Sequence, residues 1–246
     1  MSYLFDPQNY RWLLDLASVR FLVLGFGINI GVAVMAGILS VVLAAPLALL
    51  RLRSRTYIAR IVGMWVDVWR NLPTVLIVLY VAIATPQPVQ NAITSVMPSW
   101  IPASLRSADV LVGVVGLTLY YSALLAEVYR AAIEAVPRGQ AEATAALGLS
   151  GRDSLRFVIA PQGLRAMMPA LVSQIISLVK NSTLISIIAV PEALRHAQIL
   201  ANSSFSGSPP VPLLHVFAFT GLLFILVNVC LSRIARSFET MQANSR

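Results

Sequence analysis

The sequence predicts an all-α membrane protein with five transmembrane helices. Of its 246 residues, 58% are hydrophobic and 11% are charged, whereas soluble domains carry about 25% charged residues. The charges are missing from long apolar runs, each long enough to cross a bilayer as a helix. All but one of the basic residues are arginines, and most of them cluster beside these runs. Such clusters orient membrane helices, so the net charge of +8 does not indicate nucleic-acid binding.

The apolar runs define the predicted spans of a single transmembrane domain over residues 1–246. The first run is too long for a cleaved signal and follows no basic segment, so we expect it to be a retained span. Pro86–Ser107 is rich in proline and is expected to be a loop, with room for a short interfacial helix. The spans cover residues 21–50, 57–85, 108–135, 166–190 and 211–231.

The arginines predict the orientation of the spans. Eleven lie on the face that holds the C-terminus, and four lie on the opposite face. The positive-inside rule then places the C-terminus in the cytoplasm and the N-terminus outside. No internal repeat is visible, so we expect a second subunit, either the same chain or a paralogue, to supply two-fold symmetry. The eleven arginines on the face of the C-terminus are Arg51, Arg53, Arg55, Arg60, Arg138, Arg152, Arg156, Arg165, Arg233, Arg236 and Arg246.

The link between the third and fourth spans, residues 136–165, carries the strongest local signals. Gln140–Leu147 is rich in helix formers, and Gly148 follows where a helix C-terminal glycine belongs. Ser150, with an acidic residue three positions later, makes a capping-box pattern for a second short helix, which Pro161 is expected to limit. Two short helices that meet at a glycine turn are therefore expected on the cytoplasmic face, and a knob of this kind can seat in a groove of a soluble partner. An ordinary interfacial helical hairpin is the alternative.

This segment resembles the EAA loop of ABC importer permeases. That pattern is Glu-Ala-Ala, three residues, Gly, nine residues, an apolar residue, one more residue and an apolar–Pro pair. The matching residues are Glu142, Ala143, Gly148, Val158 and Pro161, with Thr144 for the second Ala and Ala160 for the usual Leu. The resemblance implies a type I ABC importer permease fold whose loop docks into a cleft of an ATP-hydrolysing subunit. The implied docking residues are Gln140, Glu142, Ala143, Ala146, Leu147, Gly148 and Pro161.

Three more segments resemble permeases for polar amino acids, of the histidine, glutamine, arginine and glutamate class. They are Trp69–Thr74, Tyr121–Arg130 and Leu178–Leu184. The resemblance implies a multi-pass subunit of a bacterial plasma (inner) membrane importer, in contact with lipid. Its implied partners are an ATP-binding subunit dimer and an extracytoplasmic solute-binding protein. ATP and Mg would bind the ATPase subunits, because this chain has no phosphate-binding glycine-rich loop; we expect no cofactor on it and no enzymatic activity.

Lys180 is the outstanding polar residue within a predicted span, since a charge in the bilayer costs a few kcal/mol or more. It lies about 22 Å along the fourth span, beyond the midplane toward the outer face. Its ammonium could bind a substrate carboxylate, with Asn181, Ser182 and Thr183 adding donors and acceptors at a helix break. Snorkelling outward, or pairing with a carboxylate, is the alternative. Asn181 replaces an Asp of many relatives, which favours glutamate, glutamine or aspartate as cargo.

Arg70, Thr74 and Glu127 are the remaining candidate substrate contacts. Arg70 either lines the path or anchors the second span at the inner interface. Pro73 is expected to kink or break that span and to free carbonyls near Thr74. Glu127 and Arg130 are three positions apart, so they can pair on one helix face; a gate or pocket contact is the other interpretation for Glu127.

Two other functional classes compete with the importer subunit. A self-contained secondary amino-acid transporter would need an internal repeat or more spans. A membrane-embedded enzyme would need catalytic pairs or metal ligands within the spans, and the sequence shows neither spacing. Cys230 is the single cysteine, so no internal disulfide and no paired thiolate site are expected.

Overall fold

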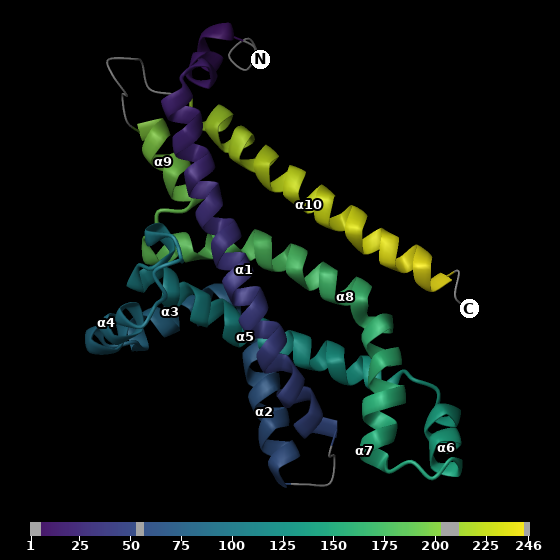
Figure 1. Ribbon diagram of the computed structural model, residues 1–246. Helices are drawn as coiled ribbons and strands as arrows, with labels where there is room; N and C mark the ends of the chain where they lie inside the picture. Colours follow the sequence, from purple (N-terminus) through teal and green to yellow (C-terminus); the bar gives the residue numbers. More distant parts are fainter. Residues whose placement is uncertain (1–5, 53–56, 203–211, 244–246) are drawn as a thin grey trace. The chain divides into compact units, whose positions relative to one another are not determined.

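The computed structural model describes residues 6–52, 57–202 and 212–243, and these are helical with short connections (Figure 1). Among them, four helices are long and apolar enough to cross a membrane, or five spans if an interrupted pair counts as one. This confirms the predicted fold class, whereas the orientation of the termini stays a prediction. The spans are α1 (Leu16–Leu52), α2 (Tyr57–Asn71) with α3 (Thr74–Ala84), α5 (Ala108–Glu134), Gly151–Ile188, and α10 (Leu213–Ala243).

The helices contribute to two compact units. Unit 1 comprises Met1–Ala36, Thr74–Leu117 and Leu178–Val229, and unit 2 comprises Gly37–Pro73, Thr118–Ser177 and Cys230–Arg246. The predicted docking residues all belong to unit 2, and Lys180 with its polar neighbours belongs to unit 1. The single-domain assignment of residues 1–246 stays a prediction.

Helix α1 begins at Leu16, five residues before the predicted start of the first span. Asp15 caps it, because its carboxylate oxygens accept hydrogen bonds from Ala17 N at 3.2 Å and from Ser18 N at 3.1 Å. A carboxylate at this position satisfies backbone donors that have no partner within the helix. Two members of the predicted arginine cluster at the other end, Arg53 and Arg55, lie outside the described residues.

The second span is interrupted at Pro73, as the sequence predicts. Helix α2 ends at Asn71 and α3 begins at Thr74, because proline cannot donate a backbone hydrogen bond and clashes with the preceding turn. The side-chain amide of Asn71, the last residue of α2, donates to the carbonyl of Asp67 one turn earlier, at 2.7 Å. The following loop contains the expected short helix, α4 (Gln87–Ser95), and a 3-10 turn, η3 (Ala103–Leu105).

In unit 1, helix α3 packs against the 3-10 segment η5 (Ser182–Ile188). Glycines of α5 make room for both. A Cβ at Gly113 would lie 2.7 Å from Ile185 Cγ2, and one at Gly116 would lie 3.0 Å from the Cα of Val78. Small residues allow this close approach of backbones in membrane proteins. The core of unit 1 therefore depends on residues that have no side chain.

In unit 2, the ends of α1 and α5 pack with α2 and α8 (Ala160–Asn181) around small residues. At Gly163 in α8, an added Cβ would lie 3.0 Å from the carbonyl oxygen of Ala132 in α5. The buried hydrophobic cluster of unit 2 consists of Ala44, Ala48, Val66, Ala123, Leu125, Ala126, Tyr129, Ala132 and Met167.

The fourth span differs most from its prediction of residues 166–190. A helix begins at Gly151 and runs through a π turn (η4, Leu155–Ile159) into α8, so the predicted end at Pro161 is wrong. Pro161 is only the second residue of α8 and lies two positions after the π turn ends at Ile159, where the change of hydrogen-bond pattern tolerates a missing N–H. At the other end α8 stops at Asn181, η5 follows, and Ala189 terminates it with a φ of 63°.

Helix α10 extends twelve residues beyond the predicted end of the fifth span at residue 231. Arginines there are good helix formers, so polarity ends the apolar run without ending the helix. The predicted first residue of this span, Val211, lies outside the described residues. Helix α9 (Ala193–Asn202) has no counterpart among the predictions.

Candidate functional site

The elbow, as we call residues 138–154, consists of α6 (Arg138–Ala146), the turn at Gly148 and α7 (Gly151–Ser154). Figure 1 shows α6 and α7 side by side in unit 2, and the two helices are in contact. Gly148 has a φ of +76°, a left-handed conformation that glycine adopts at helix C-termini. Its N–H donates to Ala145 O at 3.0 Å. The predicted glycine turn is confirmed.

Three local contacts hold the elbow together. Ser150 caps α7 as predicted, because its Oγ accepts from Asp153 N at 3.2 Å. The hydroxyls of Thr144 in α6 and Ser154 in α7 are buried and hydrogen-bonded to each other. The Thr144 carbonyl accepts from Leu149 N at 3.0 Å. Thr144 is one of the two residues that depart from the EAA pattern, and the sequence alone did not reveal its partner.

The predicted docking residues lie on the outside of unit 2. Leu147, at the tip of the elbow, is 78% exposed. A large apolar side chain exposed at the tip of a turn is typical of a surface that another protein covers. All the members are exposed: Gln140, Glu142, Ala143, Ala146, Leu147, Gly148 and Pro161. Their exposure is compatible with docking, which stays a prediction.

An ion network surrounds Glu127 in unit 2. Arg51 Nη1 lies 2.5 Å from Glu127 Oε2, and Arg130 pairs with the other carboxylate oxygen. Arg70 Nη1 lies 3.9 Å from Glu127 Oε2 and its Nε lies 3.3 Å from Asp67 Oδ1. The network comprises Arg51, Asp67, Arg70, Glu127, Arg130 and Glu134. Its positive and negative charges are equal in number, and it joins the ends of α1, α2 and α5.

This network decides between the two interpretations of Glu127 only in part. The predicted pair with Arg130 is confirmed, and Arg70 is brought to the same carboxylate. A substrate ammonium would have to compete with these guanidinium groups, and the role of Glu127 and Arg70 in substrate binding stays a prediction. Arg51 was missed because it lies 76 positions away in sequence, beyond any local pattern.

The predicted helix break at Lys180–Thr183 is confirmed in unit 1, since α8 ends at Asn181 and a 3-10 helix follows. Lys180 is exposed, and no ion pair joins it to a carboxylate in the part of the chain that the structure describes. Within the described residues the pairing alternative therefore has no partner, and substrate binding stays a prediction. Thr74 begins α3, the helix that packs against η5.

The hydroxyls of this segment donate to its own backbone. Ser182 Oγ donates to Val179 O at 2.7 Å, and Thr183 Oγ1 donates to Lys180 O at 2.9 Å. A hydroxyl has one proton, so Thr183 has only acceptor lone pairs left for a ligand. Ser182 is completely buried, so it contacts the interior of unit 1 in this structure; its predicted contact with substrate is untested.

Asn29 and Glu192, which the sequence reasoning missed, lie beside Ser182. Asn29 Nδ2 donates to Ser182 Oγ at 3.1 Å and to Glu192 Oε2 at 3.0 Å. Burial raises the pKa of Glu192, while hydrogen bonds from Leu194 N–H, Asn29 and Arg195 N–H lower it, with a net increase. The available signals were a polar residue within the apolar first span, Asn29, and a carboxylate directly before the start of a helix, Glu192.

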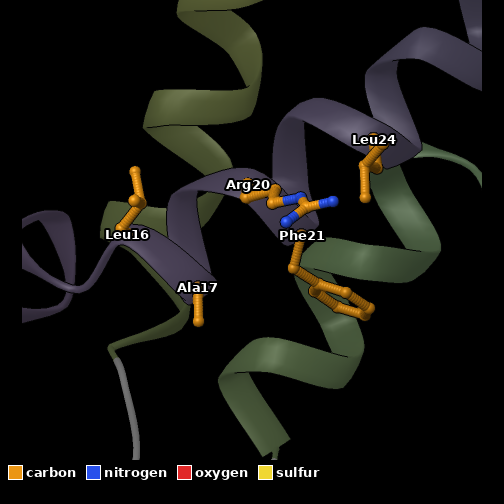
Figure 2. A pocket seen from close by; sticks show the side chains of 5 residues that line it. All are labelled: Leu16, Ala17, Arg20, Phe21 and Leu24. Carbon is orange, nitrogen blue, oxygen red and sulfur yellow. The ribbon is translucent and has the colours of Figure 1, made fainter.

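Two hollows, one on each unit, are lined by other residues than these. Figure 2 shows one of about 470 Å³ along the start of α1 in unit 1, lined by Leu16, Ala17, Arg20, Phe21 and Leu24. Another, of about 170 Å³ in unit 2, has Tyr129, Gly163 and Met167 among its lining residues. Neither is lined by a predicted substrate residue.

The apolar spans, the interrupted second span and the exposed elbow are the features of a multi-pass membrane protein. The chain belongs to the family of binding-protein-dependent transport system inner membrane components, whose model matches residues 36–241. This membership confirms the resemblance stated on the EAA pattern, and it confirms the inner-membrane location.

Curated relatives with different named cargoes match almost the whole chain. The probable glutamine ABC transporter permease protein GlnP of Bacillus subtilis is 32% identical over 89% of this chain and 92% of that protein. The glutamate/aspartate import permease protein GltK of Escherichia coli O6:H1 is 25% identical over 91% and 94%. The arginine transport system permease protein ArtQ of Bacillus subtilis is 24% identical over 94% and 97%.

A solved structure, described as the crystal structure of an amino acid ABC transporter with histidines, has the same fold. The likeness has a TM-score of 0.75 and 23% identity, and covers 93% of this chain and 97% of that chain. It confirms the importer permease fold expected from the resemblance.

Proposed function

We propose that this chain is the membrane-spanning subunit of an ATP-driven amino-acid importer, coupled through the elbow to a separate ATPase subunit. One observation carries the proposal: the exposed helix α6 is tied to α7, and α7 continues through the π turn into α8. A displacement of α6 is therefore transmitted to the fourth span without an intervening flexible loop. An interfacial hairpin would have no need of this rigid connection.

In this proposal the elbow lies in the cytoplasm, together with the C-terminus, and the N-terminus lies outside. Two ATPase subunits, which hold ATP and Mg, close on nucleotide and push the elbows of two paired membrane subunits. The pair opens toward an external solute-binding protein that carries the substrate, and hydrolysis returns it to the inward-open state. The chain itself holds no cofactor and catalyses no reaction.

We propose an acidic or amide amino acid, namely glutamate, glutamine or aspartate, as the cargo. Lys180 offers an exposed ammonium group with no described carboxylate beside it, and its neighbour Asn181 is neutral. The local charge is therefore positive, which favours substrate carboxylates and disfavours a cationic side chain. The names of the GlnP and GltK relatives support this reading, and that of ArtQ represents the competing one.

Gly148→Asp tests the coupling role against Gly148→Asn as a matched control. Asn and Asp have the same shape and both tolerate a left-handed backbone, and nothing lies within 4 Å of a Cβ at this position. The two variants therefore differ in the charge placed on the proposed docking surface. We expect Gly148→Asp to insert normally but to lose ATP-driven uptake and co-purification of the ATPase subunit. Uptake equal to that of Gly148→Asn would refute the docking role.

Lys180→Met tests the substrate assignment, with Lys180→Arg as the control that keeps the charge. Loss of a charge-assisted contact should weaken the binding of glutamate and glutamine about tenfold or more. Binding is measured on the purified membrane–ATPase complex, and competition with arginine is measured alongside. Clear preference of the wild type for arginine would contradict the proposed cargo, and unchanged binding in Lys180→Met would contradict the proposed site.

A further inference from the structure

We infer that Asn29 and Glu192 are positioning residues that hold the Lys180–Thr183 segment in place through Ser182. The inference rests on the proposed function, in which this segment contacts the substrate. It concerns unit 1 only, where α1 supplies Asn29, the residue before α9 is Glu192, and η5 begins with Ser182. None of these three side chains was expected to meet the others from the sequence.

Both amide protons of Asn29 and its carbonyl oxygen are hydrogen-bonded. Its amide group donates to Ser182 Oγ at 3.1 Å and to Glu192 Oε2 at 3.0 Å, and its Oδ1 accepts from Ala193 N at 2.9 Å. Asn29, Ser182 and Glu192 are each 0% exposed. A buried, fully satisfied network of this kind fixes one arrangement, because any shift leaves polar groups unpaired away from water.

Glu192 anchors the network to the start of α9. Its Oε2 accepts from Leu194 N at 3.0 Å and its Oε1 from Arg195 N at 2.9 Å. With the bond from Ala193 N to Asn29, three first-turn N–H groups of α9 are satisfied by side chains. These groups have no partner within their own helix, so α1 and α9 are joined firmly at this point.

Ser182 transfers this constraint to the proposed substrate segment. It donates its only proton to Val179 O at 2.7 Å, so toward Asn29 it acts as an acceptor. It occupies the first position after α8 ends and lies two residues from Lys180. Asn29 thus fixes the position at which the backbone changes from α to 3-10 geometry. This in turn fixes the direction in which the Lys180 side chain points from the end of α8.

The experiment measures equilibrium binding of glutamate and glutamine to the purified membrane–ATPase complex without the solute-binding protein. Asn29→Ala and Ser182→Ala each break the same bond, so we expect each to raise Kd about tenfold, with the double variant no worse than the more severe single one. Ser182→Thr keeps the hydroxyl and should bind within about twofold of the wild type. The thermal midpoint of each variant is recorded alongside.

Thr220→Ala is the structural control, because Thr220 is also buried in unit 1 and, among the described residues, its hydroxyl donates to Val216 O of its own helix, at 2.9 Å. We expect its Kd to be unchanged. Unchanged binding in Asn29→Ala and Ser182→Ala, multiplied effects in the double variant, or an equal loss in Thr220→Ala would each overturn the positioning role. If Lys180→Met weakens binding while these variants do not, the positioning role alone fails; if Lys180→Met binds normally, the substrate site fails with it.

Discussion

Replacing Glu127 with glutamine should destabilise unit 2, because Glu127 is the carboxylate on which three arginines converge. Arg51 Nη1 lies 2.5 Å from its Oε2, Arg130 pairs with its Oε1, and Arg70 Nη1 lies 3.9 Å away. Glutamine keeps one carbonyl acceptor, so one of the two close bonds is lost and the other loses its charge. The arginines are then left with Asp67 and Glu134 as their only acidic partners in the network.

The magnitude follows from the strength of a charge-assisted hydrogen bond, about 1.5–3 kcal/mol. The Glu127 side chain is 24% exposed, and water reduces such contributions, so we expect a loss of about 2 kcal/mol of unfolding free energy. For a chain of this size that corresponds to a decrease of about 4–8 °C in Tm. The measurement is thermal unfolding of the protein purified in detergent.

Glu134→Gln is the matched control, since it is the same substitution in the same helix. Glu134 contacts Arg130 alone within the network and its side chain is 52% exposed. Its expected cost is below about 1 kcal/mol, as for other exposed ion pairs. A Tm for Glu127→Gln equal to that of Glu134→Gln would refute the claim that the network holds the helix ends together. Unchanged stability with lost substrate binding would instead favour the pocket interpretation of Glu127.

Three further predictions follow from the packing and the polar contacts. Gly116→Ala should cost about 1–3 kcal/mol by overpacking, because its Cβ would lie 3.0 Å from the Cα of Val78; Gly27→Ala, with nothing within 4 Å, should leave the Tm unchanged or raised. Thr144→Val should speed hydrogen exchange at Leu149 N and reduce uptake, whereas Thr144→Ser keeps the hydroxyl and should behave as the wild type. Burial raises the pKa of Glu192 above its ordinary value of 4.5, so its contribution to stability is fully present below that pH and falls as pH rises through the folded pKa. Between pH 4.5 and the folded pKa of Glu192, the Tm of the wild type should therefore fall relative to that of Glu192→Gln. Parallel pH profiles of the two proteins would contradict the raised pKa of Glu192.

Much of the fold can be predicted from the sequence because a bilayer span is a continuous apolar segment, which local composition reveals. The third span was predicted at residues 108–135 and is observed at Ala108–Glu134. The interruption at Pro73 and the left-handed turn at Gly148 follow from the backbone chemistry of single residues. The errors occur where a proline or a polar stretch was taken for a helix end, as at Pro161 and beyond residue 231, since a helix continues through such residues when its other backbone bonds remain available.

Within the sites, the sequence determined which residues have the right chemistry, and the tertiary structure decided which of them meet. The EAA pattern, the lone Lys180 and the Glu127–Arg130 pair can be recognised from the sequence because each lies within one continuous segment of it. The contacts of Arg51 with Glu127, and of Asn29 with Ser182 and Glu192, join residues more than 70 positions apart. No local pattern encodes such contacts, because they form only when packed helices bring buried polar groups together and each group must find a partner away from water.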